Sequence, residues 1–142
     1  MSKTILLAVD LNDPQGAERP AEEALELAKA MGAKLHVMNV VPDFGMAVVG
    51  SFFTKDHNRQ MLDEARSALL EWSQERFGEL DGVSFSIDQG TVYEQIIKEA
   101  SQLGVDLIVV GAHKSQLKDY LIGPNAARIA RHAKQSVLVV RD

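Results

Sequence analysis

The segment from Leu107 to Arg141 reads LIVVGAHKSQLKDYLIGPNAARIARHAKQSVLVVR, and its pattern decides the fold of the chain. An apolar run near each end, Leu107–Val110 and Ser136–Val140, predicts a strand that is covered on both faces. A helix is predicted between them, from Pro124 to about Ala133, because proline suits a first helical position. Two strands joined by a helix predict parallel pairing through a right-handed crossover.

The same alternation of strands and helices runs back to the start of the chain. Further strands are predicted at Thr4–Val9, which also looks covered on both faces, at Lys34–Val41, and at Val83–Ile87, whose alternating pattern suits an edge strand. Further helices are predicted at Pro20–Met31, at about His57–Phe77, and between Thr91 and Gly104. This order predicts an α/β fold with three layers and a parallel sheet. No repeat or linker divides it, so residues 1–142 are expected to form one domain.

Glycines and one capping motif mark the predicted helix ends. Gly32 and Gly104 each follow a helical pattern directly and predict a C-terminal stop. The sequence Thr91-Val92-Tyr93-Glu94 matches a capping box, in which the threonine and glutamate side chains each bond a backbone N–H group of the first turn. The helix is therefore expected to begin directly after Thr91.

The composition excludes several kinds of protein. The 142 residues include no cysteine, which rules out disulfides and thiolate chemistry, and the four histidines lack metal-ligand spacing. The net charge of −5 argues against general affinity for nucleic acid or for anionic membranes. No apolar run approaches the ~20 residues that span a bilayer, and no signal peptide is evident. We therefore expect a soluble cytoplasmic protein.

A binding site is expected at the carboxyl ends of the strands, because ligands of open parallel sheets bind where the strand order reverses. Gly111 directly follows a buried strand, and Gly123 precedes the last helix. Backbone N–H groups at these places, together with the positive end of the helix dipole, would suit a phosphate. The alternative is that Gly111 only permits a tight exit from its strand and that Gly123 only marks a helix boundary.

The quoted segment resembles the C-terminal signature of the universal stress protein family, and its ending RHAKQSVLVVR is the most specific part. The opening TILLAVD and the strand AKLHVMNVVP are similar to the same family, so the resemblance covers the whole chain. It implies a five-stranded parallel sheet in the order 3-2-1-4-5, dimerisation through the last strand, and ATP binding in many members.

The ATP-binding motif of such proteins, Gly, two residues, Gly, nine residues, Gly and then Ser or Thr, is altered here. The first and third glycines match Gly111 and Gly123, over an interval that is one residue shorter. Lys114 replaces the second glycine and adds an ammonium group. Pro124 replaces the hydroxyl residue and has neither a hydroxyl nor an N–H. The shortened loop resembles the F/G-type branch of the family, in which His113 would follow the strand.

The resemblance implies further contacts to an adenine nucleotide. Asp10, with Ala8 nearby, matches an acidic residue beside the adenine, although it could equally be a loop or helix cap. Val40 matches a backbone contact to the base, and Val110 an apolar contact, while the N–H groups of Asn125 and Ala126 would hold the phosphates. The cofactor would be ATP, ADP or AMP. Mg²⁺ could accompany it, held mainly by phosphate oxygens and water beside Asp10, Asp13 or Asp43.

Two apolar features predict protein partners. The run Val137, Leu138, Val139 and Val140 would be an edge strand, which invites antiparallel pairing with a second copy. Residues 44–53 form an unusually apolar connection, which would be a lid, a partner surface or a segment folded against the long helix.

The leading hypothesis is a dimeric ATP-binding stress protein without robust catalysis, because no residue is an obvious base for activating water. A dimeric interaction module that has lost nucleotide binding is the second hypothesis, with Lys114 and Pro124 as the marks of that loss. A nucleotide-processing enzyme is the third, but the sequence offers no dedicated catalytic set.

Overall fold

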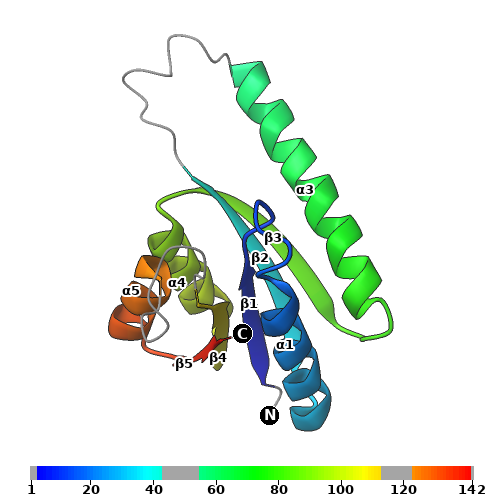
Figure 1. Cartoon of the computed structure of the whole chain (residues 1–142), viewed down its shortest axis with the longest axis vertical. Coiled ribbons are helices and arrows are strands. Elements are labelled where there is room, and N and C mark those ends of the chain that lie inside the picture. The colour runs from blue at the N-terminus through cyan, green and yellow to red at the C-terminus, as the bar shows by residue number, and fades with distance from the viewer. Residues whose placement is uncertain (1–2, 43–54, 113–122, 142) are drawn as a thin grey trace.

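A computed structural model of the chain describes residues 3–42, 55–112 and 123–141, in which strands and helices alternate (Figure 1). The elements are β1 (Thr4–Val9), α1 (Glu18–Met31), β2 (Lys34–Pro42), α3 (Lys55–Phe77), β3 (Val83–Gly90), α4 (Val92–Leu103), β4 (Leu107–Gly111), α5 (Pro124–His132) and β5 (Ser136–Val140). Every strand and helix predicted from the sequence is present, and the bounds differ by a few residues at most. None of the described helices is long and apolar enough to cross a membrane.

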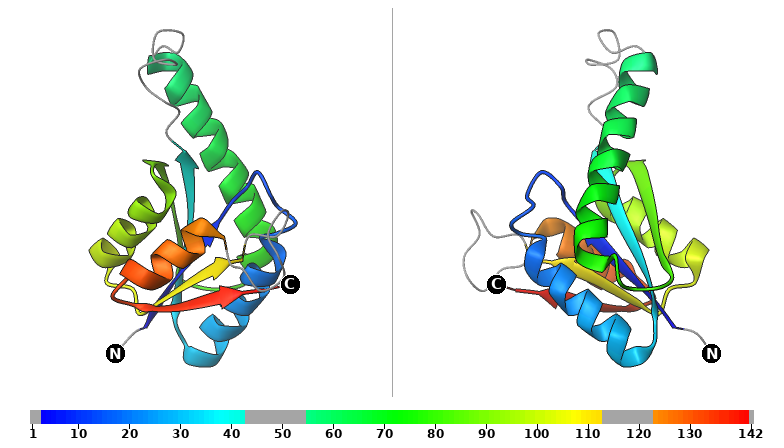
Figure 2. Two further views of the ribbon diagram at one scale, coloured as in Figure 1. Left: turned by 60° about the vertical axis from the view of Figure 1, so that its left-hand side comes forward. Right: turned by 90° about the vertical axis from the view of Figure 1, so that its right-hand side faces the viewer.

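The five strands form one parallel sheet in the order β3-β2-β1-β4-β5, which confirms the predicted topology. Helices α1 and α3 cover one face, and α4 and α5 cover the other (Figures 1 and 2). The chain builds outward from β1 to β2 and β3, then returns to the other side of β1 to add β4 and β5. The strand order therefore reverses between β1 and β4.

Each face of the sheet has its own apolar core, because successive residues of a strand point to opposite faces. On the side of α1 and α3, Ile5 and Leu7 of β1 pack with Ala21, Ala24 and Ala28 of α1. On the side of α4 and α5, the members fully or nearly fully buried are Leu6, Met38, Ile96, Ala100, Val105, Ile108, Val110, Ala126 and Ile129. Burying a side chain of this size contributes about 1.5–3 kcal/mol, so the central strands anchor both layers.

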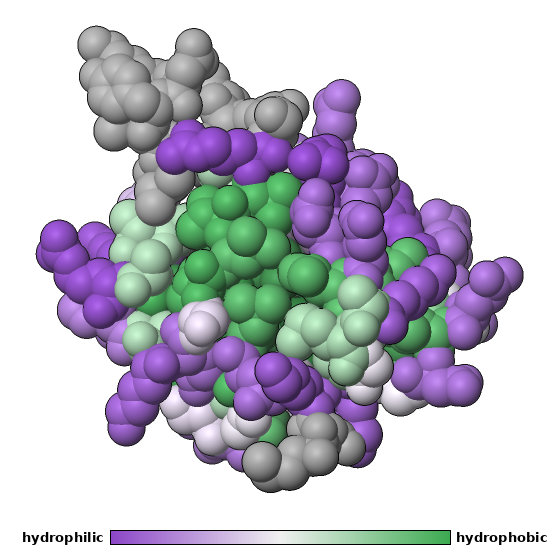
Figure 3. All heavy atoms as spheres, turned by 90° about the horizontal axis from the view of Figure 1, so that it is seen from below, coloured by the Kyte–Doolittle hydropathy of each residue, from purple (hydrophilic) through white to green (hydrophobic). Residues whose placement is uncertain are grey.

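The prediction of strands covered on both faces holds for β1 and β4 and in part for β5, whose side chains pack against the cores on both faces but are less completely buried. In β5, Ser136 is exposed and Val137, Leu138 and Val139 are only half-buried. The physical reason is position, since β5 lies at the margin of the sheet and, among the strands that the structure describes, pairs with β4 alone. The end of the molecule at which β1 begins also shows hydrophobic surface bordered by hydrophilic side chains (Figure 3). Apolar surface of this kind is typical of an interface.

Both predicted glycine stops are confirmed, and the capping box is wrong. Gly32 and Gly104 adopt left-handed conformations, with φ of 61° and 65°, and their helices end there. Thr91 occupies the N-cap of α4 but makes no side-chain capping bond. The Glu94 carboxylate instead lies 3.4 Å from the hydroxyl of Tyr93, so the reciprocal arrangement does not form.

The fully buried apolar residues of α3 lie in its C-terminal half. Leu69, Trp72 and Phe77 are buried there, whereas the first half is more exposed and meets β3 through two side-chain hydrogen bonds between Asn58 and Gln89, at 3.0 and 3.1 Å (Figure 1). The end of α3 is held by Arg76, whose guanidinium lies 4.5 Å from the centre of the Trp72 ring and pairs with Glu18 at the start of α1. This contact joins the two helices that cover the same face.

Candidate functional site

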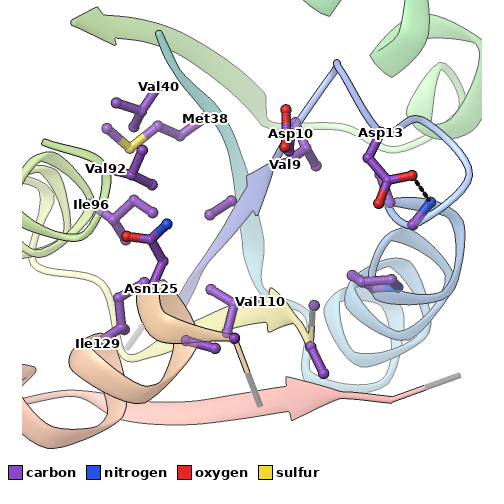
Figure 4. A pocket seen from close by; sticks show the side chains of 18 of the residues that line it. Val9, Asp10, Asp13, Met38, Val40, Val92, Ile96, Val110, Asn125 and Ile129 are labelled. Atoms are coloured by element: carbon purple, nitrogen blue, oxygen red, sulfur yellow. Dashed lines mark hydrogen bonds between the residues drawn. The ribbon is translucent and has the colours of Figure 1, made fainter. Parts of the chain in front are cut away.

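A cavity of about 340 Å³ opens at the carboxyl ends of the strands, at the reversal between β1 and β4 (Figure 4). Its walls come from the ends of β1, β2 and β4, from the loop that follows β1, and from α1, α4 and α5. An open parallel sheet leaves a crevice at this point because the chain departs in opposite directions from two neighbouring strands. The cavity therefore lies where the sequence predicts a site.

The loop after β1 supplies the polar wall of the cavity. Asp10 accepts a hydrogen bond from the backbone N–H of Asn12 at 2.9 Å, and Asp13 accepts one from Gly16 at 3.1 Å. These bonds shape the turn that leads into α1, so Asp10 does have the local structural role that was its alternative interpretation. One oxygen of each carboxylate makes the bond, and the other adds negative charge to the lining.

The opposite wall is apolar and combines β2 with α4 and α5. It is formed by Met38 and Val40 of β2, Val92 and Ile96 of α4, and Ile129 of α5 (Figure 4). Strand β2 extends beyond the end of β1 here: the pairing of the two strands ends at Val9 and Asn39, and β2 continues to Pro42. In the described part of the chain, the last residues of β2 thus have no strand beside them on the side of β1. Their backbone edge borders the cavity.

The N-terminus of α5 closes the cavity at the end of β4. Gly123 is the N-cap in an extended conformation and Pro124 is the first helical residue, as predicted. The first intrahelical bond in this turn runs from the N–H of Ala127 to the carbonyl of Gly123, so the N–H groups of Asn125 and Ala126 precede the helical ladder. Two N–H groups that have no partner within the described helix, together with the positive end of the helix dipole, are suited to an anion.

Gly111 permits close packing between β4 and the start of α1. A Cβ atom at this position would lie 3.0 Å from Cγ of Pro20 and 3.4 Å from the carbonyl oxygen of Gly16. The residue has no positive φ, so its conformation alone does not demand glycine. The absence of a side chain instead lets the start of α1 approach the end of β4, which narrows the cavity on that side.

The structure brings together all nine predicted site residues that it describes: Ala8, Asp10, Val40, Val110, Gly111, Gly123, Pro124, Asn125 and Ala126 all line this one cavity. His113 and Lys114 lie outside the described residues, as do Asp43 and the apolar segment 44–53. Among the residues described, no cluster of three or more histidine, aspartate or glutamate side chains could hold a metal ion.

The sequence missed most of the apolar wall. Met38, Val92, Ile96 and Ile129 have the spacing of core residues, and they do belong to the core or pack against it. Their second role depends on how α4 and α5 sit over the ends of β2 and β4. No signal in the sequence distinguishes a core residue at the rim of a cavity from one beneath it.

A second polar cluster, missed by the sequence, lies outside the cavity between β2 and β3. His36 is 5% exposed, and its Nδ1 and Nε2 lie 2.7 and 2.8 Å from the hydroxyls of Ser84 and Ser86. Burial lowers the pKa of His36, and the nearby Asp88 opposes this effect. The pKa of Asp88 is itself raised, first by burial and then by the adjacent carboxyl of Glu99.

The model of the Universal stress protein family matches residues 1–141 of the chain. Universal stress protein G of Escherichia coli O157:H7 is 26% identical over 143 residues, which cover 99% of this chain and 100% of that protein. Universal stress protein A homolog 1 of Coxiella burnetii is 33% identical over 147 residues, with 97% and 95% covered.

Solved structures share the fold. The universal stress protein UspA from Lactobacillus plantarum superposes with a TM-score of 0.78 at 23% identity, and the match covers 98% of this chain and 97% of that one. A universal stress protein in complex with cAMP has a TM-score of 0.62 at 20% identity, with 97% and 96% covered. The universal stress protein from Archaeoglobus fulgidus in complex with dAMP has a TM-score of 0.56 at 18% identity, with 96% of each chain covered.

Proposed function

The chain belongs to the universal stress protein family, and from this premise we propose that it binds an adenine nucleotide in the cavity between β1 and β4 and acts as a dimeric regulatory protein. The observation that carries the proposal is that nine residues, which the glycine pattern and the family resemblance assign to a nucleotide site, come from four strands and helices and one loop and line a single cavity. Related proteins of known structure hold cAMP and dAMP, which supports adenine nucleotides as the ligand class. ATP is the finer proposal.

The base and ribose would occupy the part of the cavity nearest β1 and β2. Val40 lies in the stretch of β2 beyond its pairing with β1, where no described strand lies beside it, so its backbone would be placed to meet a base edge. Ala8 and Val110 would pack against the base, and the second carboxylate oxygen of Asp10 would accept a hydrogen bond from a ribose hydroxyl.

The phosphates would lie toward Gly111 and the start of α5. The N–H groups of Asn125 and Ala126 would donate to phosphate oxygens, while Pro124 has none to give. The charged side chains in the described lining, Asp10 and Asp13, are both acidic and repel a polyphosphate. A Mg²⁺ ion held by the phosphates and water beside these carboxylates would offset the repulsion. His113 and Lys114 would add positive charge from the following loop.

We propose a signalling role in the response to stress, with at most very slow ATP hydrolysis. The described lining holds two carboxylates, two asparagines and no histidine, lysine or arginine, and both carboxylates already accept a hydrogen bond from the backbone of their own loop. Nucleotide occupancy would instead alter the dimer or a partner surface. The half-buried residues Val137, Leu138 and Val139 of β5 would form the dimer edge by antiparallel pairing with a second copy.

The first experiment is to denature the purified protein and to identify any released nucleotide by mass spectrometry. In parallel, ATP with Mg²⁺ at 100 times its Kd should stabilise the folded state by about 2.7 kcal/mol and raise Tm by roughly 8 °C. Gly123→Val places a side chain at the mouth of the phosphate site and should abolish the shift. Absence of binding by ATP, ADP and AMP at millimolar concentration would refute nucleotide binding.

Lys114 and Pro124 stand where the ATP-binding motif of the family has a glycine and a serine or threonine. This difference favours a second candidate, a dimeric interaction module that no longer binds nucleotide. In that case nucleotide would leave Tm unchanged, while light scattering would still report a dimer. Val139→Glu would then convert the dimer to monomer, because it places charges at the apolar edge of β5.

A further inference from the structure

Asn125 interrupts the apolar wall of the cavity. The polar side chains in the described lining are Asp10, Asn12 and Asp13 on the loop after β1, and Asn125 alone on α5. In Figure 4 the carboxamide of Asn125 points away from α5 and lies beside Ile96, on the side of the cavity where Met38, Val40 and Val92 also lie. A polar group thus stands among apolar side chains, well apart from the polar wall.

The carboxamide of Asn125 has no hydrogen-bond partner among the described residues. It does not cap α5, because Gly123 occupies the N-cap and no side-chain capping bond is made there. In the free protein, water satisfies the exposed amide. A ligand that covers it displaces this water, and an amide left unpaired against an apolar wall weakens binding. The site therefore favours a ligand with a hydrogen-bond donor beside an acceptor.

We propose that the Asn125 side chain reads the purine base, pairing its oxygen with the 6-amino group of adenine and its NH₂ with the adjacent ring nitrogen N7. This inference rests on the proposed function. The donor and acceptor of a carboxamide match this edge of adenine, whereas guanine offers two acceptors there and would leave the amide oxygen unpaired. The 6-amino group carries two N–H bonds, so the backbone of Val40 can pair with the second. The backbone N–H of Asn125 remains free for a phosphate.

The test compares AMP with purine riboside 5′-monophosphate, which lacks the 6-amino group, by isothermal titration calorimetry. The wild-type protein should prefer AMP by about tenfold. Asn125→Leu keeps the branched shape of the side chain but removes its donor and acceptor, so the preference should fall from about tenfold to about threefold, the part that the remaining hydrogen bond to the backbone of Val40 supplies. The matched control is Asn12→Leu, which changes an asparagine on the polar wall of the same cavity and should preserve the preference. Thermal melts without ligand verify that both variants are folded.

An unchanged preference in Asn125→Leu overturns this inference and leaves the proposed function standing. Equal losses of affinity for the two nucleotides in Asn125→Leu also overturn it, because they place the side chain on the ribose or phosphate. If the wild-type protein binds neither nucleotide, the proposed function fails and the inference fails with it.

Discussion

Replacing His36 with glutamine is expected to make the stability of the protein less dependent on pH. His36 is buried on β2, and both ring nitrogens lie within hydrogen-bond distance of a serine hydroxyl on β3. Burial lowers the pKa of this histidine below its ordinary value of 6.5, against the opposing effect of Asp88. The neutral ring is thus favoured in the folded state.

The sign of the pH effect follows from the proton balance. As the pH falls below about 6.5, the unfolded chain takes up a proton at His36 before the folded protein does, so the wild type loses stability. The loss ends once the pH has passed the lower pKa of the folded state. Asp88 has a raised pKa and acts in the opposite direction, because above pH 3.8 the folded state keeps its proton longer than the unfolded chain. Glutamine at position 36 does not titrate, so the loss due to histidine disappears.

The magnitude at pH 8 comes from the hydrogen bonds. The imidazole ring joins two serines, at 2.7 and 2.8 Å, and a glutamine amide replaces one of these contacts. Losing one hydrogen bond costs about 1 kcal/mol, which corresponds to a fall in Tm of about 3 °C for a chain of this size. The gap between wild type and His36→Gln should narrow as the pH falls from 8 to 5.

The assay is thermal unfolding by circular dichroism at half-unit steps between pH 5 and 8. Ser84→Ala is the matched control, since it removes one hydrogen bond of the same ring but leaves His36 able to titrate. Asp88→Asn separates the contribution of the carboxylate, which Glu99 and Lys98 of α4 also face. A gap between His36→Gln and wild type that stays constant or widens toward pH 5 would refute the reasoning.

Leu69→Ala should lower the free energy of unfolding by about 3 kcal/mol because Leu69 is 1% exposed, whereas Met61→Ala, at a half-buried position in the first half of α3, should lower it by about 1 kcal/mol. Urea denaturation compares the two, and equal losses would contradict the packing described for α3. Thr91→Ala should lower the free energy of unfolding by less than about 0.5 kcal/mol, because the Thr91 side chain makes no capping bond. A decrease of about 1–2 kcal/mol in the same assay would show that Thr91 does cap the helix. Gly104→Ala should lower the free energy of unfolding by about 1 kcal/mol, because φ at this position is 65°. The control is Gln102→Ala, at an exposed position of α4, which should leave the stability unchanged. Similar melting temperatures for the two variants would argue against strain at position 104.

The sequence by itself determined the order of the elements and the general place of the site. Apolar runs such as Thr4–Val9 and Leu107–Val110 indicate buried parallel strands, and Gly32 and Gly104 mark helix ends through a local conformational demand. These features depend on residues close together in the chain, which is why a pattern reveals them. Asp10, Gly111 and Gly123 follow or precede such elements directly, so their arrival at one edge of the sheet could also be predicted.

Tertiary structure alone decided the other features, because each depends on residues far apart in the chain. Gly111 is glycine because the start of α1 approaches the end of β4, and the hydrogen bonds of His36 depend on the register of β2 with β3. The exposure of β5 follows from its place at the margin of the sheet, which a strand pattern does not encode. The position of Asn125 beside Ile96 likewise depends on the packing of α5 against α4. Burial and proximity of this kind are properties of the assembled layers, so no local pattern carries them.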